Sequence, residues 1–157
     1  MAALNVEYIN PFLGAATKIL KDMCQVDVQI GKPFLREMKF TEDSLVIIIG
    51  VTGEMRGQVM IAFADEIARD VAGKMMMMPP LPQMDEIGAS AICELGNMIM
   101  GNTATLFSTK GIGIDITPPT MCNGNVTFST QFTKNICIPL VYEGGKTIEF
   151  NIAIKGD

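Results

Sequence analysis

The spacing of the hydrophobic residues changes along this chain, and the order of those changes constrains the fold most strongly. Apolar residues recur every three or four positions over 5–23, 65–77 and 84–108, as in amphipathic helices. Over 26–63 and 113–154 they alternate or form short runs, which is typical of strands. Helices and strands thus occupy separate blocks of the chain. This order predicts an α+β fold with a mainly antiparallel sheet packed against long helices, in a single domain over 1–157.

The first predicted helix, over 5–23, contains a proline. Pro11 has no backbone N–H and disfavours a helix interior. Two alternatives remain open at this point. Either the helix starts at Pro11 with Asn10 as its N-cap, or an earlier turn of the helix is bent there.

The predicted strands are separated by glycine and proline. The apolar run 45–49 predicts a central strand, and a turn at 50–54 joins it to a partner strand at 58–63. The proline-rich segment 78–82 forms a rigid connector before the long helix over 84–108, which ends at Lys110-Gly111. The later strands are predicted at 113–117, followed by a kink at Pro118-Pro119, and at 126–132, 136–142 and 147–154, with a hairpin turn at 143–146.

The composition excludes several classes of site. The chain of 157 residues has no histidine, which removes Ser-His-Asp and Cys-His catalysis and every histidine-based zinc site. Its four cysteines are widely spaced and form no Cys-x-x-Cys pair, so we expect buried free thiols rather than disulfides or metal ligands. The remaining candidates for chemistry are carboxylates, amides, hydroxyls, thiols, lysines and arginines.

Charge and hydropathy also limit the partners. A net charge of −5 argues against a nucleic-acid partner, since such proteins usually carry a basic face. The apolar runs are far shorter than the roughly 20 residues of a membrane helix. The first residues lack the basic and apolar regions of a signal peptide. We therefore expect a cytoplasmic protein that does not enter a membrane.

The long helix presents a carboxylate and a carboxamide on one face. With Glu94 at zero and 100° per residue, Asn97 falls near 300°, Ser90 near 320° and Gly101 near 340°. The apolar residues Ile92, Leu95, Ile99 and Leu106 lie on the opposite side. By spacing alone this stripe also describes an ordinary solvated helix face, because a Glu-x-x-Asn pair occurs by chance in many helices.

The residues around this pair carry a family resemblance. The segment 85–102 resembles the signature helix of the CheC/CheX/FliY family of chemotaxis phosphatases, whose pattern is Asp or Ser, three residues, Glu, two residues, Asn. Ser90, Glu94 and Asn97 match it, and Gly101-Asn102 follows as in the family. Segments 116–120 and 50–63 are similar to the family's next strand and central hairpin, so the resemblance covers nearly the whole chain.

The number of signature helices indicates the branch of the family. CheC proteins carry two such helices, whereas CheX proteins carry one. In this chain the corresponding N-terminal segment, 9–17, has no Glu followed three residues later by Asn. Glu7 and Asn10 have that interval, but the residues after Asn10 do not continue the pattern. FliY proteins add a flagellar-switch domain, for which 157 residues leave no room. The chain therefore resembles the CheX branch.

The resemblance implies a CheC-like fold and an enzyme that hydrolyses the phospho-aspartate of the response regulator CheY. Asn97 would hold the attacking water, and Glu94 would pair with the regulator's active-site lysine. Ser90 and Gly101 would contact the regulator, which supplies Mg²⁺, so the chain needs no cofactor of its own. The family also implies a homodimer joined across sheet edges. The alternative is a non-catalytic module that binds a receiver domain of a two-component or flagellar-switch system.

Three further features are ambiguous in the sequence. The run Met75 to Met78 is either an adaptable partner surface or the end of a core helix. Pro118-Pro119 either shapes a docking rim or simply kinks a sheet edge. Cys93 lies about 100° from Glu94 on the helix, which argues against a nucleophilic role.

Overall fold

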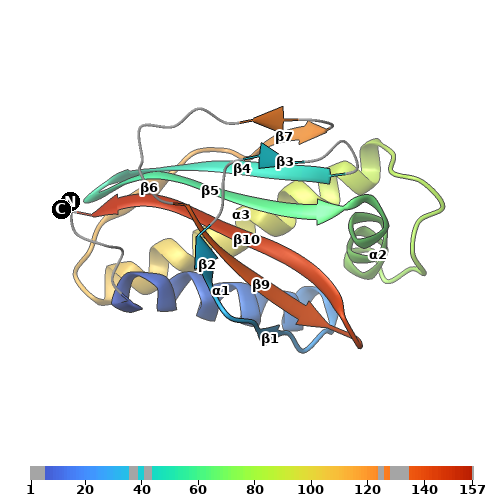
Figure 1. Ribbon diagram of the computed structural model, residues 1–157, viewed down its shortest axis with the longest axis horizontal. Coiled ribbons are helices and arrows are strands. Elements are labelled where there is room, and N and C mark those ends of the chain that lie inside the picture. The colour runs from blue at the N-terminus through green and yellow to red at the C-terminus, as the bar shows by residue number, and fades with distance from the viewer. Residues whose placement is uncertain (1–5, 36–38, 41–43, 124–125, 128–134, 157) are drawn as a thin grey trace.

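The computed structural model describes residues 6–35, 39–40, 44–123, 126–127 and 135–156 and confirms the predicted α+β fold class (Figure 1). The helices are α1 (Val6–Cys24), α2 (Asp65–Met75) and α3 (Glu86–Thr109). The strands are β1 (Gln29–Ile30), β2 (Phe34–Leu35), β3 (Lys39–Phe40), β4 (Ser44–Gly53), β5 (Met55–Ala64), β6 (Ile114–Ile116), β7 (Thr120–Asn123), β8 (Val126–Thr127), β9 (Ile136–Tyr142) and β10 (Lys146–Gly156).

The main sheet is antiparallel, in the order β1-β9-β10-β5-β4-β6. At its two sides β2 also pairs with β9 and β7 also pairs with β4, while β3 and β8 form a separate pair. Helices α1 and α3 lie side by side along one face of the main sheet, and α2 lies at one end (Figure 1). Among the described residues, no helix combines the length and apolar character needed to cross a membrane.

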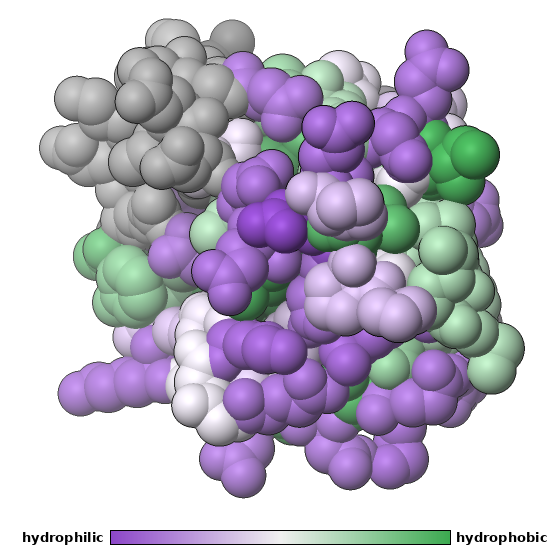
Figure 2. Space-filling view, turned by 90° about the vertical axis from the view of Figure 1, so that its right-hand side faces the viewer, coloured by the Kyte–Doolittle hydropathy of each residue, from purple (hydrophilic) through white to green (hydrophobic). Residues whose placement is uncertain are grey.

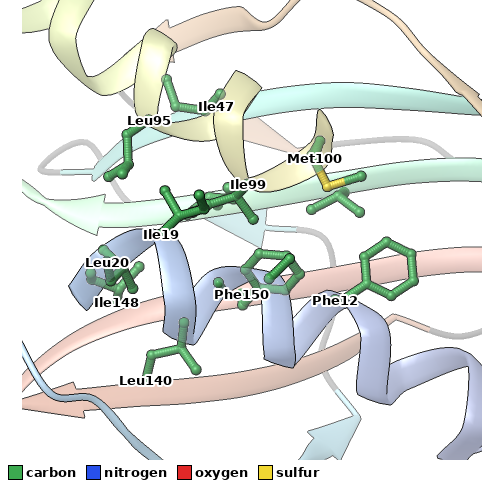
Figure 3. Close-up of a cluster of buried hydrophobic side chains, with 14 of the residues drawn as sticks. Phe12, Ile19, Leu20, Ile47, Leu95, Ile99, Met100, Leu140, Ile148 and Phe150 are labelled. Carbon is green, nitrogen blue, oxygen red and sulfur yellow. The ribbon is translucent and has the colours of Figure 1, made fainter. Parts of the chain in front are cut away.

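The core lies between this sheet face and the helices. Alternate residues of β4 point into it, because successive side chains of a strand face opposite sides. Figure 3 shows apolar side chains of both helices meeting those of the central strands in this layer: Phe12, Ile19, Leu20, Ile47, Leu95, Ile99, Met100, Leu140, Ile148 and Phe150. A second buried cluster occupies the other face of the sheet and consists of Val46, Met60, Ala62 and Ala153. Both faces of β4 are therefore apolar, which explains its unbroken hydrophobic run.

The first helix continues through its proline. α1 begins at Val6 and contains Pro11, so of the two alternatives a start at Pro11 is wrong and an earlier turn precedes the proline. The next residue, Phe12, is fully buried and packs edge-on against Phe107 of α3, with 5.4 Å between ring centroids. Packing against α3 thus offsets the loss of the helix hydrogen bond that Pro11 cannot donate.

The predicted hairpin is present, but its turn is shorter than predicted. The segment predicted as a turn at 50–54 belongs largely to β4, which continues to Gly53 before β5 starts at Met55. The reason is a third strand: β6 pairs with Val51 to Gly53 from the other side and holds them extended. Strand β7 was not predicted, and of the predicted strand 126–132 only β8 lies within the described residues.

The long helix has the boundaries that its sequence signals indicate. Asp85 is the N-cap of α3, and its side chain accepts a hydrogen bond of 2.6 Å from the N–H of Gly88. At the other end Lys110 is the C-cap, followed by Gly111 with a φ of 78°. The proline-rich segment 78–82 lies outside both helices, as predicted.

Candidate active site

The middle of α3 lies directly on strand β4. Gly96 is buried, and a Cβ atom there would come within 3.1 Å of Cγ2 of Ile47, so glycine allows this close approach. Leu95 is buried beside it. Because these two residues face the sheet, Glu94 and Asn97 point away from it, and both side chains are exposed. The packing of the helix therefore determines which face carries the polar pair.

A break in the sheet edge forms the opposing wall. β6 and β7 both pair with β4, and the residues between them, Thr117 to Pro119, interrupt the edge. Thr117 replaces the missing ladder bonds: its N–H donates to the carbonyl of Gly50 at 3.0 Å, and its Oγ1 accepts from the N–H of Gly50 at 2.8 Å. The predicted kink is present, and it is anchored to β4.

The helix and this wall enclose an open groove of about 500 Å³. Its lining is Ser90, Cys93, Glu94 and Asn97 from α3, and Ile116, Thr117, Pro118 and Pro119 from the wall. Three of the four predicted site residues, Ser90, Glu94 and Asn97, therefore meet in one groove. The fourth, Gly101, is half-buried and lies outside the lining, with open space around the position where a Cβ would stand.

The groove carries negative charge, and none of the described residues that line it is a cation. Among the lining residues that the structure describes, Glu94 is the one carboxylate, and none is lysine or arginine. Within the described part of the chain, the side chains of Glu94 and Asn97 make no hydrogen bond or ion pair. The described part of the chain also contains no group of three or more Cys, Asp or Glu side chains that could hold a metal ion. Both polar groups are thus available to an outside partner.

Cys93 also lines the groove. At 100° per residue it lies about 100° from Glu94 but only about 40° from Asn97. Its side chain is half-buried, and burial raises the pKa of its thiol. A raised pKa keeps the thiol protonated near neutral pH, which disfavours nucleophilic attack by the thiolate. In the groove Cys93 contributes apolar surface.

This arrangement suits hydrogen bonding and positioning. A carboxamide offers both a donor and an acceptor, a carboxylate accepts, and a hydroxyl does either. Without a cation, however, these groups cannot by themselves neutralise an anionic substrate. An anionic substrate bound in this groove would therefore need its positive charge from another source.

Comparison with known proteins decides the family. A family model described as "Chemotaxis phosphatase CheX" matches residues 45–141, which include every residue that lines the groove. The chain belongs to this family. The match spans more than half of the chain. It confirms the resemblance to the CheX branch that the signature helix indicated.

Individual relatives extend the CheX likeness over the whole length. The CheY-P phosphatase CheX of Thermotoga maritima is 29% identical over 152 residues, covering 97% of this chain and 98% of the relative. The crystal structure of a CheX–CheY–BeF3–Mg complex from Borrelia burgdorferi is 33% identical, with a TM-score of 0.80 over 96% of this chain and 99% of that one. A CheC-like superfamily protein from Shewanella is 28% identical, with a TM-score of 0.85 over 98% of this chain and 100% of that one.

Sequence reasoning overlooked one exposed residue of the CheX signature helix. Ile87, in the first turn of α3, has 68% of its surface exposed. It lies only about 20° from Glu94 around the helix at 100° per residue, so the spacing alone could have placed it on the same face. The spacing alone could not predict that the Ile87 side chain is exposed to solvent.

Proposed function

We propose that this chain, a member of a phosphatase family, hydrolyses the phospho-aspartate of a CheY response regulator by inserting α3 into the regulator's active site. One observation carries the proposal above the others. Glu94 and Asn97 stand one turn apart and are exposed. Among the described residues neither side chain has a partner, and the groove lining contains no cation. Such a groove suits a substrate whose charge is already neutralised elsewhere.

Asn97 orients the attacking water in this proposal. Phosphoryl transfer passes through a loose transition state, so positioning and electrostatics supply most of the catalysis. The amide oxygen accepts from the water and the amide N–H₂ donates, which together fix a nucleophile in line with phosphorus. Water attacks the phosphorus, the bond to the aspartate oxygen breaks, and the products are a free carboxylate and inorganic phosphate.

Glu94 holds the helix in register through the regulator's active-site lysine. A carboxylate facing a phosphoryl group would be repelled unless a cation lies between them. The lysine and the Mg²⁺ of the regulator supply that charge, so the chain itself provides no metal. The Glu94–lysine contact is then a charge-assisted hydrogen bond that forms only in the complex.

The rest of the exposed stripe supports docking. Ser90 lines the groove one turn before Glu94 and is placed to contact the regulator's surface. Gly101 has open space where a side chain would project, which leaves room for close approach of the partner at that end of the stripe. The proposal places this reaction in the cytoplasm, as the sequence predicts.

We include a homodimer joined across sheet edges in the proposal. Ile30, Phe34 and Leu35 lie on the short strands β1 and β2 beside β9, and they are 48%, 47% and 66% exposed. Apolar residues at an open sheet edge favour pairing with another strand. This edge is formed by different strands from those that flank the groove, which leaves one free α3 per subunit.

The direct test is the loss of phosphate from purified phospho-CheY with and without the protein, in the presence of Mg²⁺. The proposal predicts accelerated release of inorganic phosphate that scales with the amount of protein. Binding to phospho-CheY without any acceleration would instead support the non-catalytic receiver-binding module. The absence of both binding and acceleration would exclude the two functions for that regulator.

A further inference from the structure

Ile87 is a large apolar side chain that the fold leaves in solvent. It is 68% exposed and belongs to neither of the two buried clusters. Figure 2 views the end of the molecule where α2 lies and shows a largely hydrophilic face, with hydrophobic surface toward its right-hand and left-hand edges. The exposed hydrophobic residues of the α2–α3 connector and the first turn of α3 are Met77, Met78 and Ile87.

The position of Ile87 is fixed by its neighbours in the first turn of α3. The carboxylate of Asp85 accepts from the N–H of Gly88 at 2.6 Å, and the N–H of Ala89 donates to the carbonyl of Asp85 at 2.9 Å. Gly88 is buried against Leu81 of the connector. Because Gly88 faces inward in this capped turn, Ile87 is held outward.

Ile87 shares its helix face with the polar pair of the groove. It precedes Glu94 by seven residues, which at 1.5 Å per residue is about 10 Å along the helix axis. The two side chains differ by only about 20° in direction around that axis. Ser90 lies between them on the same stripe and is exposed. Because α3 is a continuous helix over this span, a partner whose active site receives Glu94 and Asn97 and whose surface follows the helix would meet Ile87 about 10 Å from Glu94.

We infer that Ile87 is an apolar docking contact for the phosphorylated receiver domain, so that the recognition surface of this chain extends one helical turn, about 5 Å, beyond Ser90 at the end of the groove. The inference rests on the proposed function and adds a residue that sets affinity for the substrate. It requires an apolar patch on the receiver domain beside the rim of its active site. Burial of an isolated aliphatic side chain at an interface favours association, whereas its exposure in the free protein contributes no stability.

Two observations favour a receiver domain over other occupants. The stripe that carries Ile87 is continuous with the groove, whereas the exposed apolar residues suited to a second copy lie on β1 and β2. Ile87 also follows two acids, Asp85 and Glu86, which are both exposed. Neighbouring carboxylates repel an anionic lipid surface.

The test compares Ile87→Ala with the wild type in steady-state hydrolysis of phospho-CheY. We expect the KM to rise about 10-fold while kcat stays unchanged, since a lost docking contact weakens binding and leaves the reacting groups in place. Binding to CheY carrying Mg²⁺ and beryllofluoride, measured by calorimetry, should weaken by the same factor. Ile87→Leu keeps the apolar surface and should restore the wild-type KM.

Met77→Ala is the matched control, because Met77 is 87% exposed but lies between α2 and α3, outside the helix that carries the stripe. It should leave KM, kcat and binding unchanged. An unchanged KM for Ile87→Ala, or a fall in kcat at constant KM, would overturn the inference. So would an equal effect of Met77→Ala, or a change in oligomeric state on sedimentation, which would assign Ile87 to a second copy. Failure of the wild type to accelerate hydrolysis would instead overturn the proposed function.

Discussion

Thr117 and Gly50 are joined by a pair of hydrogen bonds across the sheet edge: Oγ1 of Thr117 lies 2.8 Å from the N–H of Gly50, and the Thr117 N–H lies 3.0 Å from the Gly50 carbonyl. A Cβ on residue 50 would stand 3.0 Å from the Thr117 methyl, so glycine allows the contact. The pair anchors Pro118 and Pro119 opposite Glu94. The shape of the groove therefore depends on a side chain that carries no charge and needs to touch no substrate.

Substitution of Thr117 by valine should loosen this wall. Valine keeps the shape but removes the acceptor for the Gly50 N–H, which costs about 1 kcal/mol of unfolding free energy for a typical hydrogen bond. We expect a several-fold fall in kcat/KM on phospho-CheY. Thr117→Ser retains the hydroxyl and should behave like the wild type. If Thr117→Val and Thr117→Ser give the same rates and the same urea midpoint, the hydroxyl does not hold the wall.

Glu94 should act through its charge. Glu94→Gln keeps the shape and loses the charge, so it should lower kcat/KM nearly as much as Glu94→Ala, by about 10-fold or more for a buried charge pair. Wild-type activity should also fall as ionic strength rises, because salt screens the forming ion pair. The measurement is steady-state hydrolysis of phospho-CheY at two ionic strengths.

Glu86→Gln is the control for Glu94, since Glu86 is an exposed acid of the same helix outside the groove lining. It should leave activity and the salt dependence unchanged. Wild-type behaviour of Glu94→Gln would reduce Glu94 to a neutral hydrogen-bonding group.

A buried polar contact away from the groove predicts loss of stability at alkaline pH. Tyr142 donates a hydrogen bond of 2.6 Å from its hydroxyl to the buried carboxylate of Asp70. Burial, and then this carboxylate, raise the pKa of Tyr142 above its usual 10.0. Burial also raises the pKa of Cys24 from 9.0 to about 11. Both groups keep their protons longer in the folded state than in the unfolded state.

The free energy of unfolding should therefore hold steady below pH 9 and fall as the pH rises from 9 toward 11. Each group contributes a slope of about 1.4 kcal/mol per pH unit between its unfolded and folded pKa values. Urea unfolding at pH 8 to 11 measures the slope, and Cys24→Ala and Tyr142→Phe should each flatten part of it. A stability that is constant over this range, or a slope that neither variant changes, would contradict the assignment.

The protein should form a dimer through the edge that carries β1 and β2. Light scattering is expected to give twice the mass of one chain. Leu35→Lys, which places a charge on an apolar edge residue, should yield a monomer. Met77→Lys adds the same charge at another exposed position and should leave the dimer intact. A wild-type monomer at working concentrations would rule this interface out.

Much of the fold was predictable because long helices and long strands have strong periodicity. α3 combines a capping Asp85, an apolar stripe and a terminal Gly111, and its predicted bounds differ from the structure by no more than two residues. The two-residue strands β2 and β3 carry no such pattern, because they are set by pairing with β9 and β8. For α1, local rules left two alternatives at Pro11, and the choice between them depends on the packing of Phe12 against Phe107 of α3.

The groove was predictable only on one side. Ser90, Glu94 and Asn97 share a helix face by spacing, and the sequence alone could place them together. Their relation to Thr117 depends on the pairing of two distant segments with β4, which no local pattern encodes. The inward position of Cys93 likewise depends on the wall that lies opposite it.

The most direct test of the proposed mechanism is the rate of phosphate release from phospho-CheY at a saturating concentration of Asn97→Ala, with binding to beryllofluoride-treated CheY measured in parallel. Because the amide positions water but contributes little contact area, hydrolysis should fall by about 100-fold or more. The dissociation constant should change by less than about 3-fold, since most of the interface remains. Near-normal turnover by Asn97→Ala would contradict the central role of this residue.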